Sequence, residues 1–398
     1  MKITSAILAI LLLIVCFAGC QTDVPEQNQP TVTTTEPETV PDTTAADLPP
    51  VIPENLYSVS VPITTELGQI EDETTVFSYA YQTMHLIHPD RDVADKIIID
   101  FLSRVEETRS DADQLYDFAK TKASTVGFTP YFYQVHYDPT RIDQGVLSMH
   151  GHITQRGDFA HSNMQCVSAS YDMVTGDALT LGSILYHADK KDTLCDLVIS
   201  QLEDRTDIGL YDDFRTSVER RFTKDESQDE AFYFTSQGLC FYFSPYEIAP
   251  YSAGAVTVEI PYHKLTGIIG DAYFPAEQNH STGTISTCAF EEANLNDYTQ
   301  FAEIIVSTGA TKVLLVTDSV VQDIQINALT WTDDDAEPLT HTVFASNVLS
   351  SQEAILLDAD FSNEKPSFTV SYSIGGEIQS FWLSKDATTG QIILSQVV

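Results

Sequence analysis

The hydrophobic pattern of the chain changes near Asn279, and this change limits the folds that it can adopt. Ahead of Asn279 strand-like and helix-like segments are mixed, and residues 92–122, for example, carry Val93, Ile97 and Phe101 at helical spacing. Beyond Asn279 the helical spacing disappears, and short segments of alternating apolar and polar residues take over. The sequence therefore predicts an α+β domain, with helices on an antiparallel sheet, followed by an all-β domain.

The first part contains segments of both kinds. Runs rich in Val, Tyr, Thr and Phe predict strands, whereas apolar residues three or four positions apart predict helices. One of the strand-like runs ends in the turn sequence Val174-Thr175-Gly176-Asp177. We expect strands at residues 57–64, 75–87, 131–137, 146–154, 163–173 and 231–243, and helices at residues 92–122, 192–202 and 212–222.

The second part is a series of short strand-like segments separated by turn signals such as Gly375-Gly376 and Thr389-Gly390. Such a series predicts a β-sandwich of immunoglobulin-like architecture. That fold hosts many roles, so it indicates none by itself. The expected strands are residues 312–317, 321–331, 340–344, 354–357, 367–374, 379–384 and 391–397.

The start of the chain predicts a secretory signal peptide. Lys2 is followed by an apolar run, residues 7–17, that is too short to span a membrane. Ala18 and Gly19 stand directly before Cys20, and this ending resembles the lipobox of bacterial lipoproteins. The resemblance implies that Cys20 is lipidated and anchors the mature chain to the membrane. The alternative is ordinary cleavage, with Cys20 as a bystander.

Threonine, proline and acidic residues dominate the segment that follows Cys20, and it holds too few apolar residues to fold. A proline-rich, like-charged segment stays extended at up to about 3.1 Å per residue, so it can hold a domain on the order of 100 Å from a membrane. We therefore expect the chain at the outer face of the cytoplasmic membrane. Its expected parts are a signal peptide at 1–19, a tether at 20–55, an α+β domain at 56–278 and a β-sandwich at 279–398.

The chain is strongly acidic, with a formal net charge of -38. Acidic residues outnumber lysine and arginine by 58 to 20. Nucleic acid is therefore excluded as a partner, because phosphate contacts require basic residues along a face. An acidic surface attracts basic proteins and speeds their approach. The alternative is that the acidity only keeps an exported protein soluble.

The cysteines and histidines form no metal-binding pattern in the sequence. Beyond Cys20 the cysteines are Cys166, Cys195, Cys240 and Cys288. They form no CxxC pair and have no histidine at ligand spacing, and the sequence leaves both disulfides and buried free thiols open. The ten histidines are scattered, with His85 and His88 the closest useful pair. Because no nucleophile motif is present either, we expect no metal, no cofactor and no catalysis.

Prolines and tyrosines gather in residues 243–262. Aromatic residues beside prolines in a loop are typical of contacts with a protein partner or of stacking on sugar rings, which makes Tyr246, Pro250 and Tyr251 candidates for ligand binding. The alternative is structural: the prolines fix a corner, Tyr246 packs beneath it, and Gly254 lets the chain enter the next strand.

Several segments around this corner resemble a known family. They are Phe232-Tyr233-Phe234-Thr235, residues 237–243, 245–251 and 254–262, and, upstream, residues 172–181. They resemble the extracytoplasmic domain of RsiV-type anti-sigma factors, which are membrane proteins that sense lysozyme in Gram-positive bacteria. They also resemble the domain that accompanies the catalytic domain of PdaC-type peptidoglycan deacetylases. The resemblance covers residues 57–274 and does not extend to the predicted sandwich.

The resemblance adds one more candidate residue, His161. The family carries a Gly-Gly-Ala-His-Gly loop where this chain reads Gly157-Asp158-Phe159-Ala160-His161-Ser162. Asp158 and Ser162 replace glycines of that loop, which narrows the backbone angles available to it. The resemblance implies a domain that binds a wall-directed protein or wall glycan. It does not imply capture of a sigma factor, because residues 1–19 leave no cytoplasmic segment for one.

The sequence thus predicts a membrane-anchored extracytoplasmic binding lipoprotein of Gram-positive type that is not an enzyme. Its expected partner is lysozyme or another basic wall-directed protein, because the resemblance and the acidic charge agree. The second hypothesis is a module that binds the peptidoglycan of the cell wall without catalysis. The third is an accessory cell-wall hydrolase, although the sequence does not identify a pair of catalytic carboxylates.

Overall fold

The computed structural model describes residues 56–71, 73–158, 162–223, 230–275, 283–290, 298, 300–306, 311–331, 338–361, 365–374 and 377–397. Contacts divide the chain at residue 50, and all of the described residues belong to the second of the two units, residues 50–398. Everything below concerns the second unit. Two of the candidate residues, Cys20 and His161, lie outside the described residues, as do the predicted tether and the predicted domain border after residue 278.

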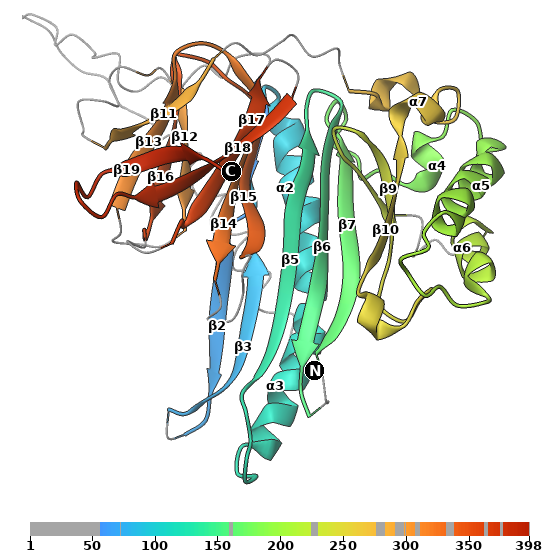
Figure 1. Cartoon of the computed structure of the whole chain (residues 1–398). Helices are drawn as coiled ribbons and strands as arrows, with labels where there is room; N and C mark the ends of the chain where they lie inside the picture. The colour runs from blue at the N-terminus through green and yellow to red at the C-terminus, as the bar shows by residue number, and fades with distance from the viewer. Residues whose placement is uncertain are drawn as a thin grey trace, which may run out of the picture. The chain divides into compact units, whose positions relative to one another are not determined.

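A five-stranded sheet with two helices on one face forms the first layer pair (Figure 1). Its strand order is β2-β3-β5-β6-β7, and all pairs are antiparallel except β3 with β5, which the two helices connect. The strands are β2 (Ile63–Gln69), β3 (Thr75–Gln82), β5 (Tyr131–Ile142), β6 (Val146–Arg156) and β7 (Asn163–Asp172), and the helices are α2 (Arg91–Glu107) and α3 (Arg109–Lys122). β7 ends in the predicted turn, where Gly176 adopts a φ of 71°.

The helices form where the sequence predicts them because each signal is present. Asp90 caps α2 by accepting hydrogen bonds from the backbone N–H groups of Asp92 and Val93. Ile97 and Phe101 lie on the buried face of α2 and pack against tyrosines of the sheet. The predicted helix 92–122 is in fact two helices, because the chain breaks at Thr108.

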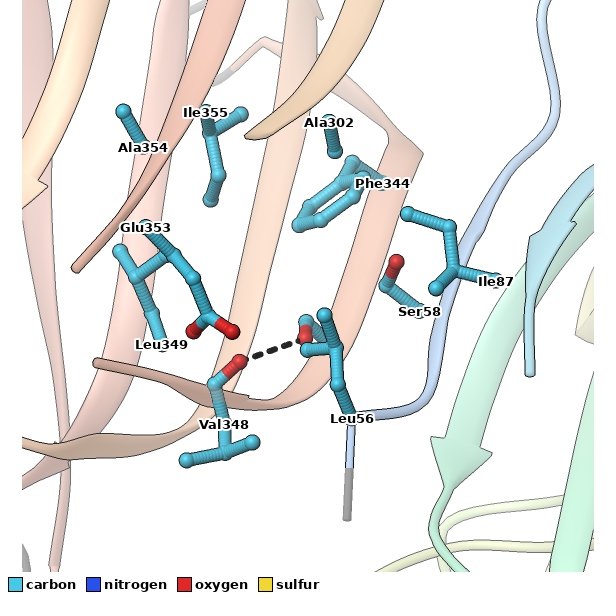
Figure 2. Close-up of a pocket in the computed structure, with 11 residues that line it drawn as sticks. Leu56, Ser58, Ile87, Ala302, Phe344, Val348, Leu349, Glu353, Ala354 and Ile355 are labelled. Carbon is cyan, nitrogen blue, oxygen red and sulfur yellow. Dashed lines mark hydrogen bonds between the residues drawn. The ribbon is translucent and has the colours of Figure 1, made fainter. Parts of the chain in front are cut away.

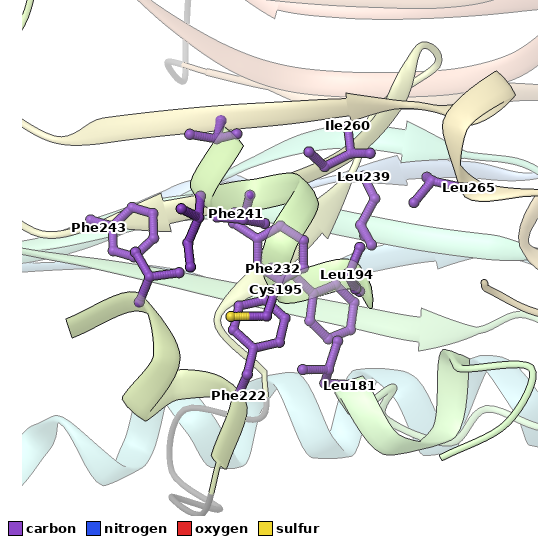
Figure 3. Close-up of a cluster of buried hydrophobic side chains, with 14 of the residues drawn as sticks. Leu181, Leu194, Cys195, Phe222, Phe232, Leu239, Phe241, Phe243, Ile260 and Leu265 are labelled. Carbon is purple, nitrogen blue, oxygen red and sulfur yellow. The ribbon is translucent and has the colours of Figure 1, made fainter. Parts of the chain in front are cut away.

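A second, smaller layer pair consists of a three-stranded antiparallel sheet of order β10-β9-β8 with its helices. Its elements are α4 (Leu181–Ile184), α5 (Lys190–Glu203), α6 (Phe214–Thr223), β8 (Phe232–Phe234), β9 (Gly238–Phe243), the 3₁₀ helix η3 (Tyr251–Ala253), β10 (Val256–Pro261), α7 (Tyr262–Leu265) and η4 (Asp271–Tyr273). Figure 3 shows its core, in which Phe232 and Phe241 lie among side chains from the helices. Cys195 lies in this core, and all four described cysteines are free thiols.

The C-terminal part is a sandwich of two sheets around a shared apolar core. One sheet has the order β11-β13-β16-β12 and the other the order β19-β18-β17-β14-β15-β1-β4. The strands are β11 (Ile285–Ala289), β12 (Gln300–Ile305), β13 (Thr311–Thr317), β14 (Val321–Thr330), β15 (Leu339–Leu349), β16 (Glu353–Ala359), β17 (Phe368–Ile374), β18 (Glu377–Lys385) and β19 (Ile392–Gln396). The predicted fold class, an α+β domain followed by a β-sandwich, is confirmed.

Two short strands from the start of the described chain, β1 (Ser58–Ser60) and β4 (His85–Ile87), complete the larger sheet of the sandwich. β1 pairs with β15 on one side and with β4 on the other. Figure 2 shows the contact region, where Leu56 and Phe344 line a cavity of about 20 Å³. The predicted strands 57–64 and 75–87 are therefore each two strands that belong to different sheets.

No described helix is both long and apolar enough to cross a membrane.

Candidate functional site

The connection between β9 and β10 carries three of the candidate residues and forms a corner with an aromatic pair on its outside. Tyr246 is 57% exposed and has a φ of 71°, in the left-handed region that residues other than glycine rarely occupy. Its ring lies 5.3 Å from the ring of Tyr251. The hydroxyl of Tyr251 donates a hydrogen bond of 2.9 Å to the carbonyl oxygen of Ser162. We call Tyr246 and Tyr251 the tyrosine pair.

A buried ion pair holds this corner from below. The side chain of Arg221, on α6, is only 7% exposed and donates hydrogen bonds of 2.8 and 2.6 Å to Glu247. Glu247 also accepts a hydrogen bond from the backbone N–H of Ser244. The guanidinium lies 4.4 Å from the ring centre of Phe243, within cation–π distance. Because Glu247 follows Tyr246 directly, this pair fixes the backbone beside the exposed ring.

The structure combines the two interpretations of this segment. Pro250 is exposed and stands at the start of η3, and Gly254 has a φ of 68° as the chain turns toward β10, as expected for a corner. Tyr246, however, does not pack beneath the corner, because more than half of its side chain faces solvent. Ser162, which bonds to Tyr251, directly follows His161 in the sequence, but His161 itself lies outside the described residues.

A second group of polar side chains lies where β15 contacts β5, and it was not among the residues that the sequence predicts as candidates. His136 and Asp138 lie two positions apart on β5, so both face the same side of the sheet. His341, on β15, places its ring 4.2 Å from that of His136. His152, on β6, is the register partner of His136, and their rings lie 5.5 Å apart. We call His136, Asp138 and His341 the histidine cluster.

Hydrogen bonds fix the position of Asp138 within the cluster. Its Oδ1 accepts a bond of 2.9 Å from Nε2 of His136 and one of 2.7 Å from the backbone N–H of Thr342. His341 also lines a cavity of about 650 Å³, together with His85 and residues of β12 and β14. Burial lowers the pKa of both His152 and His341, and the neighbouring His136 lowers each further.

Residues in or next to the histidine cluster could in part have been found from the sequence, because they alternate along strands. His150-Gly151-His152 alternates within a predicted strand, and alternation places its outer two residues on one face. His136 lies in the predicted strand 131–137, but Asp138 lies one residue beyond its predicted end, which the structure extends to Ile142. Nothing in the sequence connects either stretch to His341, because their proximity depends on how β15 packs against β5. His85 and His88, the closest useful pair of histidines in the sequence, do not form a site together: buried His88 contacts the backbone of Asp90 and Met173, whereas His85 is exposed.

His150 gives the fold a pH dependence. Its ring stacks on Tyr233 at 4.4 Å and lies 5.0 Å from that of Tyr242, and burial lowers its pKa to about 4. Asp138 opposes this shift, and His152 reinforces it. Because the pKa of an unfolded histidine is about 6.5, the unfolded chain binds the proton more tightly, so stability is full above about pH 6.5 and falls toward pH 4.

Because of His150, we expect the free energy of unfolding to fall by roughly 2 to 3 kcal/mol between pH 6.5 and 4. Urea unfolding at a series of pH values measures this change. His150→Phe keeps an aromatic ring on Tyr233 but cannot be protonated. The variant should therefore lose part of the pH slope between pH 6.5 and 4. An unchanged slope would show that His150 is not responsible.

In fold, the described chain is an α+β unit with an aromatic corner, joined to a β-sandwich. Within it, residues 184–263 match the model of a family described as "Protein of unknown function (DUF3298)". The chain therefore contains a DUF3298 domain, which includes Tyr246, Pro250 and Tyr251.

Two solved structures of this family are similar to the chain. A family member from Bacteroides fragilis is 17% identical with a TM-score of 0.37, and the match covers 54% of this chain and 94% of that one. A family protein from Pseudomonas aeruginosa is 18% identical with a TM-score of 0.37, and the match covers 55% of this chain and 97% of that one. No curated protein matches the chain. The finer resemblance to RsiV-type and PdaC-type proteins stays a prediction.

Proposed function

We propose that the chain is a lipid-anchored extracytoplasmic binding protein that works without catalysis and whose partner docks on the tyrosine pair. The observation that carries this proposal is Tyr246 itself. Its large aromatic side chain is exposed to solvent, and its backbone has a positive φ. This conformation costs on the order of 1 to 3 kcal/mol for a residue other than glycine. Such outliers cluster at ligand sites, where the surrounding structure maintains them.

The supports of the corner prepare the tyrosine pair for binding. The Arg221–Glu247 ion pair fixes the backbone, and the hydrogen bond from Tyr251 to Ser162 fixes the second ring. A rigid aromatic pair loses little conformational entropy when a partner covers it, and tyrosine is enriched among the residues that dominate binding energy. The surface therefore suits docking better than a mobile loop would.

The charge of the chain favours a basic protein as the partner. At a net charge of -38, long-range attraction accelerates encounters with cationic proteins, while the tyrosine pair supplies contacts that salt does not screen. Lysozyme is the specific candidate, because the RsiV-type resemblance implies a partner of this kind. Lipidation of Cys20 and the tether would place the binding domain within the cell-wall zone.

The test is binding of residues 50–398 to hen-type lysozyme over a series of salt concentrations. In the double variant Tyr246→Ala, Tyr251→Ala we expect an affinity loss of about 2 kcal/mol or more, roughly 30-fold, because each ring is a hot-spot type of contact. Tyr186→Ala is the matched control, because Tyr186 is 54% exposed and lies outside the corner. Its affinity should equal that of the unchanged chain.

Two results would contradict the proposal. Binding that disappears at physiological salt and is equal in all variants would reduce the interaction to nonspecific charge attraction. The second is binding to purified peptidoglycan that depends little on salt and is lost without the tyrosine pair. This result would show that the ligand is wall glycan and not a basic protein.

A further inference from the structure

The histidine cluster has the composition of a metal site. His136, Asp138 and His341 each offer one ligand atom, and these atoms all lie within 4.8 Å of one another. Two imidazoles and one carboxylate form a common ligand set for zinc and related divalent transition metals. The cluster is unrelated to the tyrosine pair, which lies on the connection between β9 and β10.

The burial and contacts of His136 decide which of its ring nitrogens can serve as the ligand. The side chain of His136 is only 1% exposed, and its Nδ1 has no hydrogen-bond partner among the described residues. A buried ring nitrogen without a partner costs free energy, and native proteins seldom leave one unsatisfied unless a water or an ion completes it. Nε2 is the nitrogen that faces Asp138, at 2.9 Å, so Nε2 would be the ligand atom and Nδ1 would carry the proton of the ring.

From these observations we propose that the histidine cluster binds a divalent transition metal of the zinc class through His136, Asp138 and His341. This departs from the expectation from the sequence, which was for no metal. The proposal is independent of the proposed function, because it concerns another surface and another ligand.

The distances fit such a site after small side-chain rotations. Ligand bonds of about 2.0 to 2.2 Å place tetrahedral ligand atoms roughly 3.3 Å apart. His136 and Asp138 already approach to 2.9 Å, so the adjustment falls mainly on His341. Asp138 is fixed in place by the N–H of Thr342, which acts as the outer hydrogen bond that orients a ligating carboxylate.

Three protein ligands leave a fourth position open. The side chain of Asp138 is 31% exposed, and His341 lines the cavity of about 650 Å³, so water has access to the cluster. Because His136 and Asp138 belong to the five-stranded sheet and His341 to the sandwich, one ion would cross-link the two. Metal binding should therefore stabilise the folded chain.

The experiment is a titration of the purified full chain, in detergent and freed of metal with a chelator, with Zn²⁺ alone. We expect one saturable site and a higher midpoint of thermal unfolding. Co²⁺ bound at the same site should show the visible absorption of a tetrahedral complex. Ca²⁺ serves as the probe for nonspecific attraction to the acidic surface, because it prefers oxygen ligands.

Two ligand variants and one control make the test specific. His341→Ala should lower the Zn²⁺ affinity by more than the roughly 10- to 100-fold that loss of an outer hydrogen bond costs. Asp138→Asn should do the same while it keeps an oxygen that can accept the bond from Thr342, which protects the fold. His85→Ala is the control, because His85 lines the same cavity outside the cluster and should not affect affinity.

Circular dichroism establishes that each variant is folded before its affinity is compared. The proposal is overturned if the folded chain has no saturable Zn²⁺ site. It is equally overturned if His341→Ala and Asp138→Asn bind Zn²⁺ as tightly as the unchanged chain, or if Ca²⁺ displaces Zn²⁺ at equal concentration.

Discussion

Replacement of Glu247 by alanine is expected to lower the free energy of unfolding by about 3 to 5 kcal/mol. The variant leaves the guanidinium of Arg221 buried without its counter-ion, and a buried unpaired charge is among the most destabilising single changes. Nη1 of Arg221 already has no hydrogen-bond partner among the described residues, so nothing nearby compensates. Urea unfolding followed by circular dichroism measures the change.

An exposed ion pair on the same chain provides the control for Glu247→Ala. Arg205 and Asp207 are joined at 2.8 Å but lie largely in solvent, and exposed pairs contribute little. Asp207→Ala should therefore unfold at nearly the same urea concentration as the unchanged chain. If Glu247→Ala behaves like Asp207→Ala, the Arg221–Glu247 pair does not stabilise the corner and does not hold the tyrosine pair rigid.

Gly151→Ala should also be strongly destabilising, at about 3 kcal/mol. Gly151 lies on β6 opposite Tyr137 of β5, where a Cβ would overlap the carbonyl oxygen of His136 and stand 2.7 Å from the Cα of Tyr137. These are main-chain atoms that cannot rotate away, so the two strands must separate locally. The same unfolding measurement, together with loss of the pairing between β5 and β6 in hydrogen exchange, would report it.

Gly209→Ala is the matched glycine control. A Cβ at Gly209 meets nothing within 4 Å, and an added methyl group in open space reduces the entropy of the unfolded chain. We expect its stability to be unchanged or slightly higher. If Gly151→Ala were equally harmless, β5 and β6 would not approach each other as closely at this position as the structure shows.

The sequence predicted the elements well where the signal is local. The strand signals located every predicted strand of the sandwich, from β13 to β19, including β16, which is buried along its whole length rather than on one face. They missed β11 and β12. The predicted strand at 57–64 failed for a different reason: Val61 and Pro62 separate two strands whose partners lie in different sheets, and propensity does not encode the partner.

The candidate sites were likewise predictable where their residues are close in the sequence, and not where they come together only through packing. The tyrosine pair was predictable because Tyr246 and Tyr251 lie five positions apart, on one short corner between strands. The exposure of Tyr246 was not, since it goes with a positive φ in a corner whose Glu247 pairs with Arg221 of the distant helix α6. The histidine cluster was beyond reach, because its members come together only when β15 packs against β5.

The position of β1 has a consequence for the order in which the chain can assemble. Ser58 pairs with Ser346, so the first described strand lies between β4, which follows it closely, and β15, which is made near the end of synthesis. β1 is synthesised long before β15, so it cannot complete its hydrogen bonding until β15 has been made. Folding of this protein must therefore finish late, and any fragment that stops ahead of β15 leaves its own first strand with an unpaired edge.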